Sequence, residues 1–387
     1  MSSVTSAPVS ASTDRCAYVV LVMRGDAYVP GALVCAHSVR LAGTRHELVC
    51  MVTEDVSGAA RAALALVFDR VLEVQRLRCA VLPLRTAKQR RMYGAWMDQA
   101  CTKWACLGLA EYRRVLLLDA DVVALRSLDA LFEQPAPAAT FSSPFAAPYI
   151  NDLRYVRTAA EREERVRRGK CRGFRNPYVT LRHGDRVPAS AIQEGLERAV
   201  VLIGACVLLE PNRAHLEQLK LFLGLFTDEQ PFGYPGCNSS YDEQVLTVFC
   251  AQLLKLEFTH VAPAYNYIPW HRAWLPPVED TPSAHRAIEC APKLFHFFNL
   301  KPWDMRRAQW LDLEVWWQLA AHLTTQDVLS DEQRQQLRAH FNVEDLDAAP
   351  RVGCAWCKHS ALPDEDEWRG HSALLVSDAR VTLCQRL

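Results

Sequence analysis

Residues 114–124 read RVLLLDADVVA, an apolar run followed by two aspartates. Val115 to Leu118 is wholly apolar, as expected for a strand that is buried on both faces of a sheet. Asp119 and Asp121 follow at the carboxyl end of that strand, where open α/β sheets bind ligands. Residues i and i+2 of an extended chain point to the same side, so both carboxylates can address one cation such as Mg²⁺ or Mn²⁺. An acidic pair alone is weak evidence, because solvated acidic pairs are common in loops.

On both sides of this strand the chain alternates between short apolar segments and helical ones. The expected strands are residues 17–23, 48–53, 70–74 and 114–118, and the expected helices are residues 30–41, 56–68 and 98–110. Pro30 near the start of the first helix and Gly43 just past its end are typical helix boundaries. Alternating strands and helices predict an α/β fold, Rossmann-like, with a mostly parallel central sheet.

The composition excludes several classes of protein. The chain has 387 residues, of which 50% are hydrophobic, so it contains enough apolar material for one or two cores and is not disordered as a whole. Its 44 Lys and Arg balance 44 Asp and Glu, which argues against nucleic acid as a partner and makes any anion site local. The longest strongly apolar run without charges, residues 199–209, is far shorter than the roughly 20 residues of a membrane-spanning helix.

The first residues and the cysteines indicate the compartment. Residues 1–15 are rich in Ser, Thr and Ala and lack the pattern of a signal peptide, so we expect a disordered leader. Most of the 14 cysteines lie in apolar stretches, where a thiol behaves as a small hydrophobic group. We therefore expect reduced cysteines and a cytoplasmic protein.

The aspartate pair belongs to a longer pattern. Lys103 lies sixteen residues before Asp119, Tyr112 and Arg113 precede the strand, and residues 128–132 (LDALF) follow it. Further motifs occur in order along the chain: DAYVPGAL at 26–33, VLLEP at 207–211, DEQVL at 242–246 and HFFNLKPW at 296–303. Together they resemble the glycogenin-like branch of glycosyltransferase family 8. The composition is similar to that of glycogenin-like proteins from large DNA viruses and fungi.

The resemblance implies a GT-A-type fold over residues 16–325 and transfer of a hexose, most often glucose, from a UDP-sugar with retention of configuration. It implies Asp119, Asp121 and His296 as ligands of Mn²⁺ or Mg²⁺, and Asp242 and Lys103 as catalytic residues. The residues matched to the UDP-sugar site are Val22, Asp26, Tyr28, Lys103, Asp119, Ala120, Gly204, Asp242, Glu243 and Lys301. The acceptor is a carbohydrate or protein in trans, and a homodimer is a candidate assembly.

Local sequence leaves other interpretations of these residues open. Lys103 also fits a solvated helix lysine, Asp242 a helix N-cap and His296 a core histidine between two phenylalanines. Retention allows a double displacement, for which Asp242 is the only matched nucleophile, or departure of UDP from the face that the acceptor attacks. We favour the second route, in which a UDP oxygen assists the acceptor.

Several positions depart from the family pattern. Arg24 and Gly25 stand where Thr or Asn is usual, Ile203-Gly204 where the strand normally begins with Asn, and Glu243 where Gln is usual. These differences support an alternative, a catalytically silent relative that binds a nucleotide-sugar or carbohydrate as an interaction module. A nucleotidyl- or phosphotransferase ranks last, since no glycine-rich phosphate loop accompanies the aspartates. Residues 268–290 contain no tyrosine, so we do not expect glycogenin-like self-glucosylation.

Two further segments have no match in short glycogenins. Residues 151–200 hold 12 Lys and Arg against seven Asp and Glu, a net charge of +5, and form a solvated helix and loop or a lid over the anionic donor. Residues 326–387 are a helical or irregular C-terminal appendage, preceded by an expected helix at 311–323 and containing another at 330–341. Cys354 and Cys357 lack a second ligand pair, which argues against zinc.

Overall fold

The computed structural model describes residues 14–84, 86–141, 177–178, 181–197, 201–234, 240–267, 293–298, 301–307 and 313–348. Several expectations from the sequence fall outside these ranges: the leader up to residue 13, most of the basic insertion, residues 268–290 and the tail with Cys354 and Cys357.

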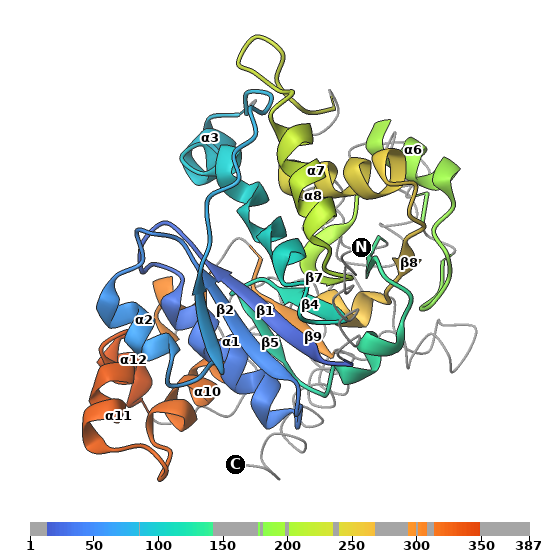
Figure 1. Ribbon diagram of the computed structural model, residues 1–387. Helices are drawn as coiled ribbons and strands as arrows, with labels where there is room; N and C mark the ends of the chain where they lie inside the picture. The colour runs from blue at the N-terminus through green and yellow to red at the C-terminus, as the bar shows by residue number, and fades with distance from the viewer. Residues whose placement is uncertain are drawn as a thin grey trace, which may run out of the picture.

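A seven-stranded sheet forms the centre of the molecule (Figure 1). Its strands are β1 (Cys16–Val22), β2 (Glu47–Val52), β3 (Arg70–Glu73), β4 (Arg114–Leu118), β6 (Ala138–Thr140), β7 (Ile203–Leu209) and β8 (Thr259–His260), in the order β3-β2-β1-β4-β7-β6-β8. Only β7 is antiparallel to its neighbours in this sheet. The expected strands and the mostly parallel sheet are confirmed, and the carboxyl ends of β1 and β4 lie side by side.

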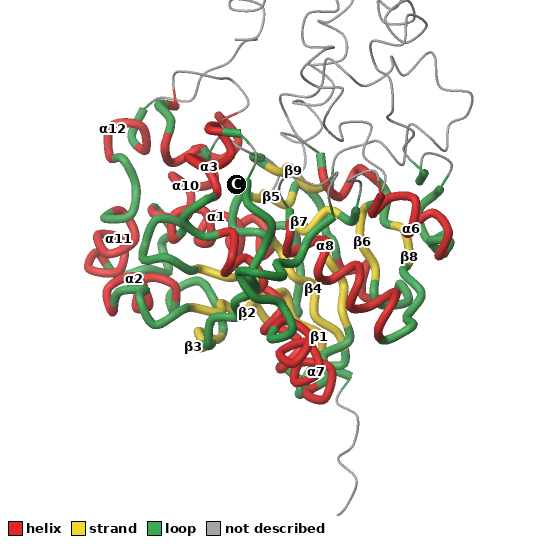
Figure 2. The backbone as a smooth tube through the Cα atoms, turned by 90° about the horizontal axis from the view of Figure 1, so that it is seen from above, coloured by secondary structure: helices red, strands yellow, loops and turns green. Residues whose placement is uncertain are grey.

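Helices cover both faces of the sheet. The α-helices are α1 (Val29–Leu41), α2 (Gly58–Leu64), α3 (Ala87–Tyr93), α6 (Ala189–Glu197), α7 (Arg213–Leu223), α8 (Tyr241–Val248), α10 (Glu314–Thr324), α11 (Asp331–Arg338) and α12 (Val343–Leu346). The 3₁₀-helices are η1 (Met97–Gly108), η2 (Asp129–Glu133), η4 (Pro263–Asn266) and η7 (Pro302–Asp304), and η3 (Phe249–Leu253) is a π-helix. Seen from above, α2 and α11 lie at the β3 edge, and α6 lies at the β8 edge (Figure 2).

Two expected helices differ in detail. The segment expected as a helix at 98–110 is the 3₁₀-helix η1, in which side chains recur every three residues. Cys101, Trp104 and Leu107 therefore form one buried row, and Lys103 lies in the next. The helix expected at 56–68 is shorter and spans Gly58–Leu64, and its start is set by the Ser57 hydroxyl, which accepts a hydrogen bond from Ala60 N.

The two faces of the sheet bury separate hydrophobic clusters, and β1 shows why. Cys16, Tyr18 and Val20 point into the cluster under α1 and α10, while Ala17 and Val19 point into the cluster under η1 and α8. This alternation follows from the two-residue period of a strand. It fixes which side of β4 meets η1, the element that carries Lys103.

The chain after residue 300 packs back on the first cluster. Leu337, Phe341 and Leu346, from the segment expected as a C-terminal appendage, are buried in the same cluster as α1. Arg307 is buried and forms a bidentate ion pair with Glu314 at 3.0 and 2.5 Å. In the described part of the chain no helix is both long and apolar enough to cross a membrane.

Candidate active site

A carboxylate–histidine cluster lies at the carboxyl end of β4. One ligand atom each from Asp119, Asp121 and His296 lies within 4.8 Å of the other two. Asp119 continues the pairing of β4 with β7, since its backbone N donates to Ala205 O at 3.1 Å. Asp121 precedes β5 (Val122–Ala124), which pairs antiparallel with β9 (Leu294–His296) so that Val122 opposes His296. This small sheet brings together residues 175 positions apart in sequence.

The surroundings of Asp121 fit a bound cation. Its Oδ2 contacts the ammonium group of Lys301, and its Oδ1 lies 3.6 Å from Nε2 of His296. The same Oδ1 is buried and accepts no hydrogen bond from the described residues. Burial alone would raise the pKa of Asp121, but the ammonium group of Lys301 outweighs it and holds the pKa well below its usual range. A buried, ionised oxygen without a donor is suited to a metal ion.

The donor set defines which metal fits. Two carboxylates and one imidazole are hard or borderline ligands, and thiols are absent from the cluster. Such ligands suit Mg²⁺ or Mn²⁺, which also keep positions for water and substrate oxygens. The predicted ligands Asp119, Asp121 and His296 are thus brought together in a suitable geometry.

Lys103 connects this cluster to α8. Its Nζ lies 2.9 Å from Oδ1 of Asp119 and 3.0 Å from Oδ2 of Asp242. Trp104 fixes the relative position of η1 and α8, because its Nε1 donates to the backbone carbonyl of Asp242 at 3.0 Å. Burial would lower the pKa of Lys103, but Asp119 and Asp242 raise it well above its usual value. The lysine is therefore a fixed positive charge, not a solvated helix lysine.

Two positions that depart from the family pattern touch each other. Gly204 N donates to Oε1 of Glu243 at 2.5 Å. A Cβ at Gly204 would lie 3.1 Å from both this oxygen and Nζ of Lys103, so a larger residue would crowd the pair. Burial, reinforced by the charge of Asp242, raises the pKa of Glu243 to about 8. Glu243 is therefore largely protonated at neutral pH and can donate a hydrogen bond as a Gln amide does.

Two aromatic residues, Tyr28 and Trp303, lie beside Lys301. Lys301 Nζ lies 5.9 Å from the ring centroid of Tyr28, and the rings of Tyr28 and Trp303 meet edge to face at 5.5 Å. Gly31 lets α1 approach, because a Cβ there would lie 2.4 Å from the Trp303 ring and 2.5 Å from Ala120 O. The first β–α turn, the β4 end and the Lys-Pro-Trp segment therefore meet here.

Other predicted residues lie nearby but less directly. Asp26 lies in the first turn, where both its carboxylate oxygens accept hydrogen bonds from Ser57, at 2.9 Å from the backbone and 2.6 Å from the hydroxyl. Val22 is buried at the end of β1. Asn266 had no predicted role, yet its Oδ1 lies 2.8 Å from Nδ1 of His296. No spacing rule connects two residues thirty positions apart, so only the folded chain reveals this contact.

Comparison with known proteins gives partial sequence matches. No family model matches the chain. It is 29% identical over 126 residues to UDP-glucuronate:xylan alpha-glucuronosyltransferase 1 of Arabidopsis thaliana, covering 33% of this chain and 18% of that protein. It is 36% identical over 115 residues to the glycogenin of Neurospora crassa, covering 30% of this chain and 16% of the relative. An uncharacterized protein of Acanthamoeba polyphaga mimivirus is 28% identical over 133 residues, covering 34% of this chain and 45% of that protein. The chain thus spans less than half the length of these curated relatives.

Among solved structures, the galactosyltransferase LgtC in complex with donor and acceptor sugar analogs has 16% identity and a TM-score of 0.45, covering 82% of this chain and 99% of that one. The strand order itself defines an α/β fold with a mostly parallel central sheet. Over the residues that match in sequence, about a third of its length, the chain is similar to glycogenins and to UDP-glucuronate:xylan alpha-glucuronosyltransferases.

Proposed function

We propose that the protein is a metal-dependent retaining glycosyltransferase that moves a hexose, glucose first among them, from a UDP-sugar to a carbohydrate or protein acceptor in trans. The observation that carries the proposal is the Asp119–Asp121–His296 cluster, in which Asp121 and His296 are buried, flanked by Lys103 and Lys301. Three ligands and two lysines at the carboxyl end of a β-strand are what a diphosphate leaving group requires. The partial matches to glycogenin and to xylan glucuronosyltransferases support the same class.

In this proposal the phosphate end of the donor lies at the metal ligands. Asp119, Asp121 and His296 would hold Mn²⁺ or Mg²⁺, which when bound supplies Lewis acidity to the leaving diphosphate. Lys301 already contacts Asp121 and lies beside the Tyr28 ring, so it can donate to a phosphate oxygen without leaving the site. Tyr28 offers its ring face to the nucleoside.

The sugar end lies toward α8. Lys103 occupies the space between Asp119 and Asp242, and so joins the metal cluster to the carboxylate expected beside the donor sugar. Asp242 pairs with this lysine and is only 7% exposed. It is therefore better suited to accept hydrogen bonds from sugar hydroxyls than to act as a free nucleophile. We therefore favour front-face transfer. The acceptor oxygen bonds to the anomeric carbon as the bond from that carbon to the phosphate oxygen breaks, and the acceptor proton passes to the departing diphosphate.

A second candidate function is a nucleotide-sugar- or carbohydrate-binding module without turnover. The Gly204–Glu243 contact favours it, because it occupies a Glu243 oxygen that would otherwise face the sugar. The same contact is compatible with catalysis if the protonated carboxyl donates to a sugar hydroxyl through its other oxygen.

One experiment separates the two functions. The protein is incubated with a panel of UDP-sugars and Mn²⁺, with EDTA as the matched control, and free UDP and glycosylated products are followed by mass spectrometry. We expect EDTA-sensitive release of UDP from at least one UDP-hexose. Saturable UDP binding with no turnover of any sugar in the panel would favour the binding module, and absence of both would reject the proposed function.

A further inference from the structure

His296 is held through both of its ring nitrogens. Nε2 faces Oδ1 of Asp121 at 3.6 Å, and Nδ1 lies 2.8 Å from Oδ1 of Asn266. His296 is 5% exposed and Asn266 is 2% exposed, so water does not compete with the second contact. The amide therefore sets the state of the ring nitrogen that faces away from the candidate metal position.

Backbone pairing fixes this contact. Tyr267 N donates to Leu294 O at 2.9 Å, and His296 N donates in return to Tyr267 O at 2.8 Å. Lys293 N donates to Ala264 O at 2.8 Å, so the end of η4 runs alongside β9 over its whole length. The register that places His296 opposite Val122 on one side thus places Asn266 beside it on the other. The contact between the Asn266 amide and the His296 imidazole therefore joins two buried side chains on paired backbone segments, and it does not involve a surface side chain.

The chemistry of the two groups selects one tautomer. In the orientation of the Asn266 amide that the structure shows, Oδ1 faces Nδ1 of His296 and can only accept, so Nδ1 carries the proton that is shared with it. In a neutral imidazole the other nitrogen is then bare. The distance of 3.6 Å from Nε2 to Asp121 is too long for a hydrogen bond, which agrees with an Nε2 that carries no proton. A bare Nε2 pointing at two carboxylates is ready to bind a metal ion.

We propose that Asn266 is a positioning residue of the metal centre, which holds His296 in the Nδ1-protonated tautomer and aims Nε2 at the cation. This inference rests on the proposed function, because it assigns a role only if Asp119, Asp121 and His296 bind a divalent ion. Second contacts of this kind orient metal-binding histidines in many proteins and typically change metal affinity by about 10- to 100-fold.

The neutral amide has a further consequence. A carboxylate at position 266 would also accept from Nδ1, but it would add a negative charge beside Asp119 and Asp121. The amide fixes the tautomer without that charge, so the cluster keeps two carboxylates for one divalent ion. An acceptor at position 266 is therefore required, and a charge there is not.

The first test is made on the unaltered, cation-free protein. Long-range ¹H–¹⁵N correlation spectra of histidine-labelled protein distinguish the protonated ring nitrogen from the bare one, and the His296→Gln variant assigns the signal among the 12 histidines. We expect the proton on Nδ1 above neutral pH. A proton on Nε2 would overturn the inference whether or not the protein is an enzyme.

The second test compares Mn²⁺ affinity, measured by electron paramagnetic resonance without any sugar donor. Asn266→Leu, similar in size but unable to accept, should weaken binding about 10-fold or more. Asn266→Asp, which restores an acceptor, should bind Mn²⁺ at least as well as the wild type at alkaline pH. Tyr267→Phe, a change at the next residue of the same segment, is the matched control and should leave the affinity unchanged.

The outcomes distinguish a failure of the role of Asn266 from a failure of the metal site. If the wild type binds Mn²⁺ and Asn266→Leu binds it equally well, the role of Asn266 is wrong and the metal site stands. If Asn266→Asp fails to restore binding, shape and not hydrogen-bond acceptance matters, which also contradicts the inference. If the wild type binds no Mn²⁺, the proposed function fails, and the tautomer measurement still decides whether Asn266 controls His296.

Discussion

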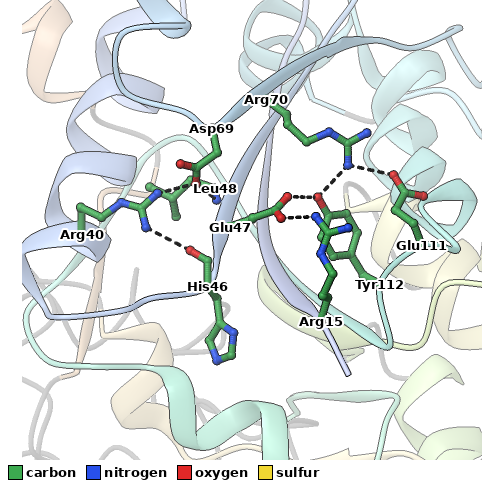
Figure 3. A network of polar contacts seen from close by, with 9 residues as sticks. All are labelled: Arg15, Arg40, His46, Glu47, Leu48, Asp69, Arg70, Glu111 and Tyr112. Atoms are coloured by element: carbon green, nitrogen blue, oxygen red, sulfur yellow. Dashed lines mark hydrogen bonds and ion pairs between the residues drawn. The ribbon is translucent and has the colours of Figure 1, made fainter. Parts of the chain in front are cut away.

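The two ends of the central sheet both carry networks of charged side chains, but only one of them suits binding. At the amino ends of the strands, Arg15 and the Tyr112 hydroxyl contact Glu47, and Arg70 donates to the Tyr112 hydroxyl at 2.7 Å and to Glu111 at 2.9 Å (Figure 3). Nearby, Asp69 accepts a hydrogen bond from Leu48 N at 2.7 Å. At the carboxyl ends, Asp119, Asp121, Asp242, Lys103, Lys301 and His296 form the candidate active site.

Solvent exposure and hydrogen bonding distinguish the two networks. The side chains of Arg15, Glu47, Arg70 and Glu111 are 30–50% exposed. In the second network that of Asp119 is 29% exposed, and the others, Lys103, Asp121, Asp242, His296 and Lys301, are 7–17% exposed. In the first network donors and acceptors match, and in the second a buried Asp121 oxygen accepts no hydrogen bond from the described residues. Matched, half-exposed ions stabilise a fold by small amounts. Buried ions with an acceptor left over indicate a ligand.

The largest expected effect is the loss of activity when a metal ligand of the buried network is replaced. Asp121→Asn removes one metal ligand and the anion that Lys301 contacts, so we expect transfer from the UDP-sugar to fall at least about 10³-fold. Glu47→Gln makes the same chemical change at the other end of the sheet and should leave activity within about twofold. Steady-state rates with circular dichroism as a folding check would measure both. Equal losses in the two variants would erase the distinction between the networks.

Lys103→Met should have the next largest effect. It leaves Asp119 and Asp242 without their shared cation in a buried setting, so both thermal stability and turnover should fall, the latter by about 10²-fold. Arg70→Met is the matched control, since its carboxylate partner Glu111 is one-third exposed and can be solvated. A Lys103→Met protein with wild-type kcat would show that this lysine serves the fold alone.

Glu243 gives a prediction with a definite sign. The folded-state pKa of about 8 lies above the ordinary value of 4.5, so the stability that Glu243 contributes is present below pH 4.5 and is lost as pH rises through 8. Glu243→Gln should therefore raise Tm relative to the wild type by a few degrees at pH 9 and much less at pH 5.

Glu111→Gln is the opposite case. Arg70 and backbone hydrogen bonding outweigh burial and lower the pKa of Glu111, so its contribution is present at neutral pH and is lost as pH falls. Thermal melts of both variants across this pH range test the pair. A Tm difference for Glu243→Gln that does not change with pH would mean that Glu243 is ionised in the folded protein.

The smallest effect is expected within the exposed network. Tyr112→Phe removes the hydroxyl between Glu47 and Arg70, and we expect a loss of about 1 kcal/mol in the free energy of unfolding, because Arg15 and water still satisfy Glu47. Added salt should reduce the difference, and activity should not change. Urea unfolding at low and high ionic strength measures this. A large loss of activity would mean that this end of the sheet communicates with the site.

The sequence predicts which residues form the buried network far better than it predicts how they contact one another. The apolar run before Asp119 and the Lys103 spacing are local features, so the strand, its carboxyl-end position and the α/β class follow from them. The approach of His296 to Asp121 follows only by resemblance, because it depends on the pairing of β5 with β9 across 175 residues. Contacts that depend on side-chain packing cannot be predicted from sequence patterns. The Gly204–Glu243 hydrogen bond and the Asn266–His296 contact are of this kind.

If the proposed function is right, the buried network holds a divalent cation together with a nucleoside diphosphate. Calorimetric titration of UDP into the full chain, with Mn²⁺ and with EDTA, tests it most directly. We expect UDP to bind the wild type and Glu47→Gln only when Mn²⁺ is present, and this binding to be lost in Asp121→Asn. Equal UDP affinity in Mn²⁺ and EDTA, or an unchanged affinity in Asp121→Asn, would contradict it.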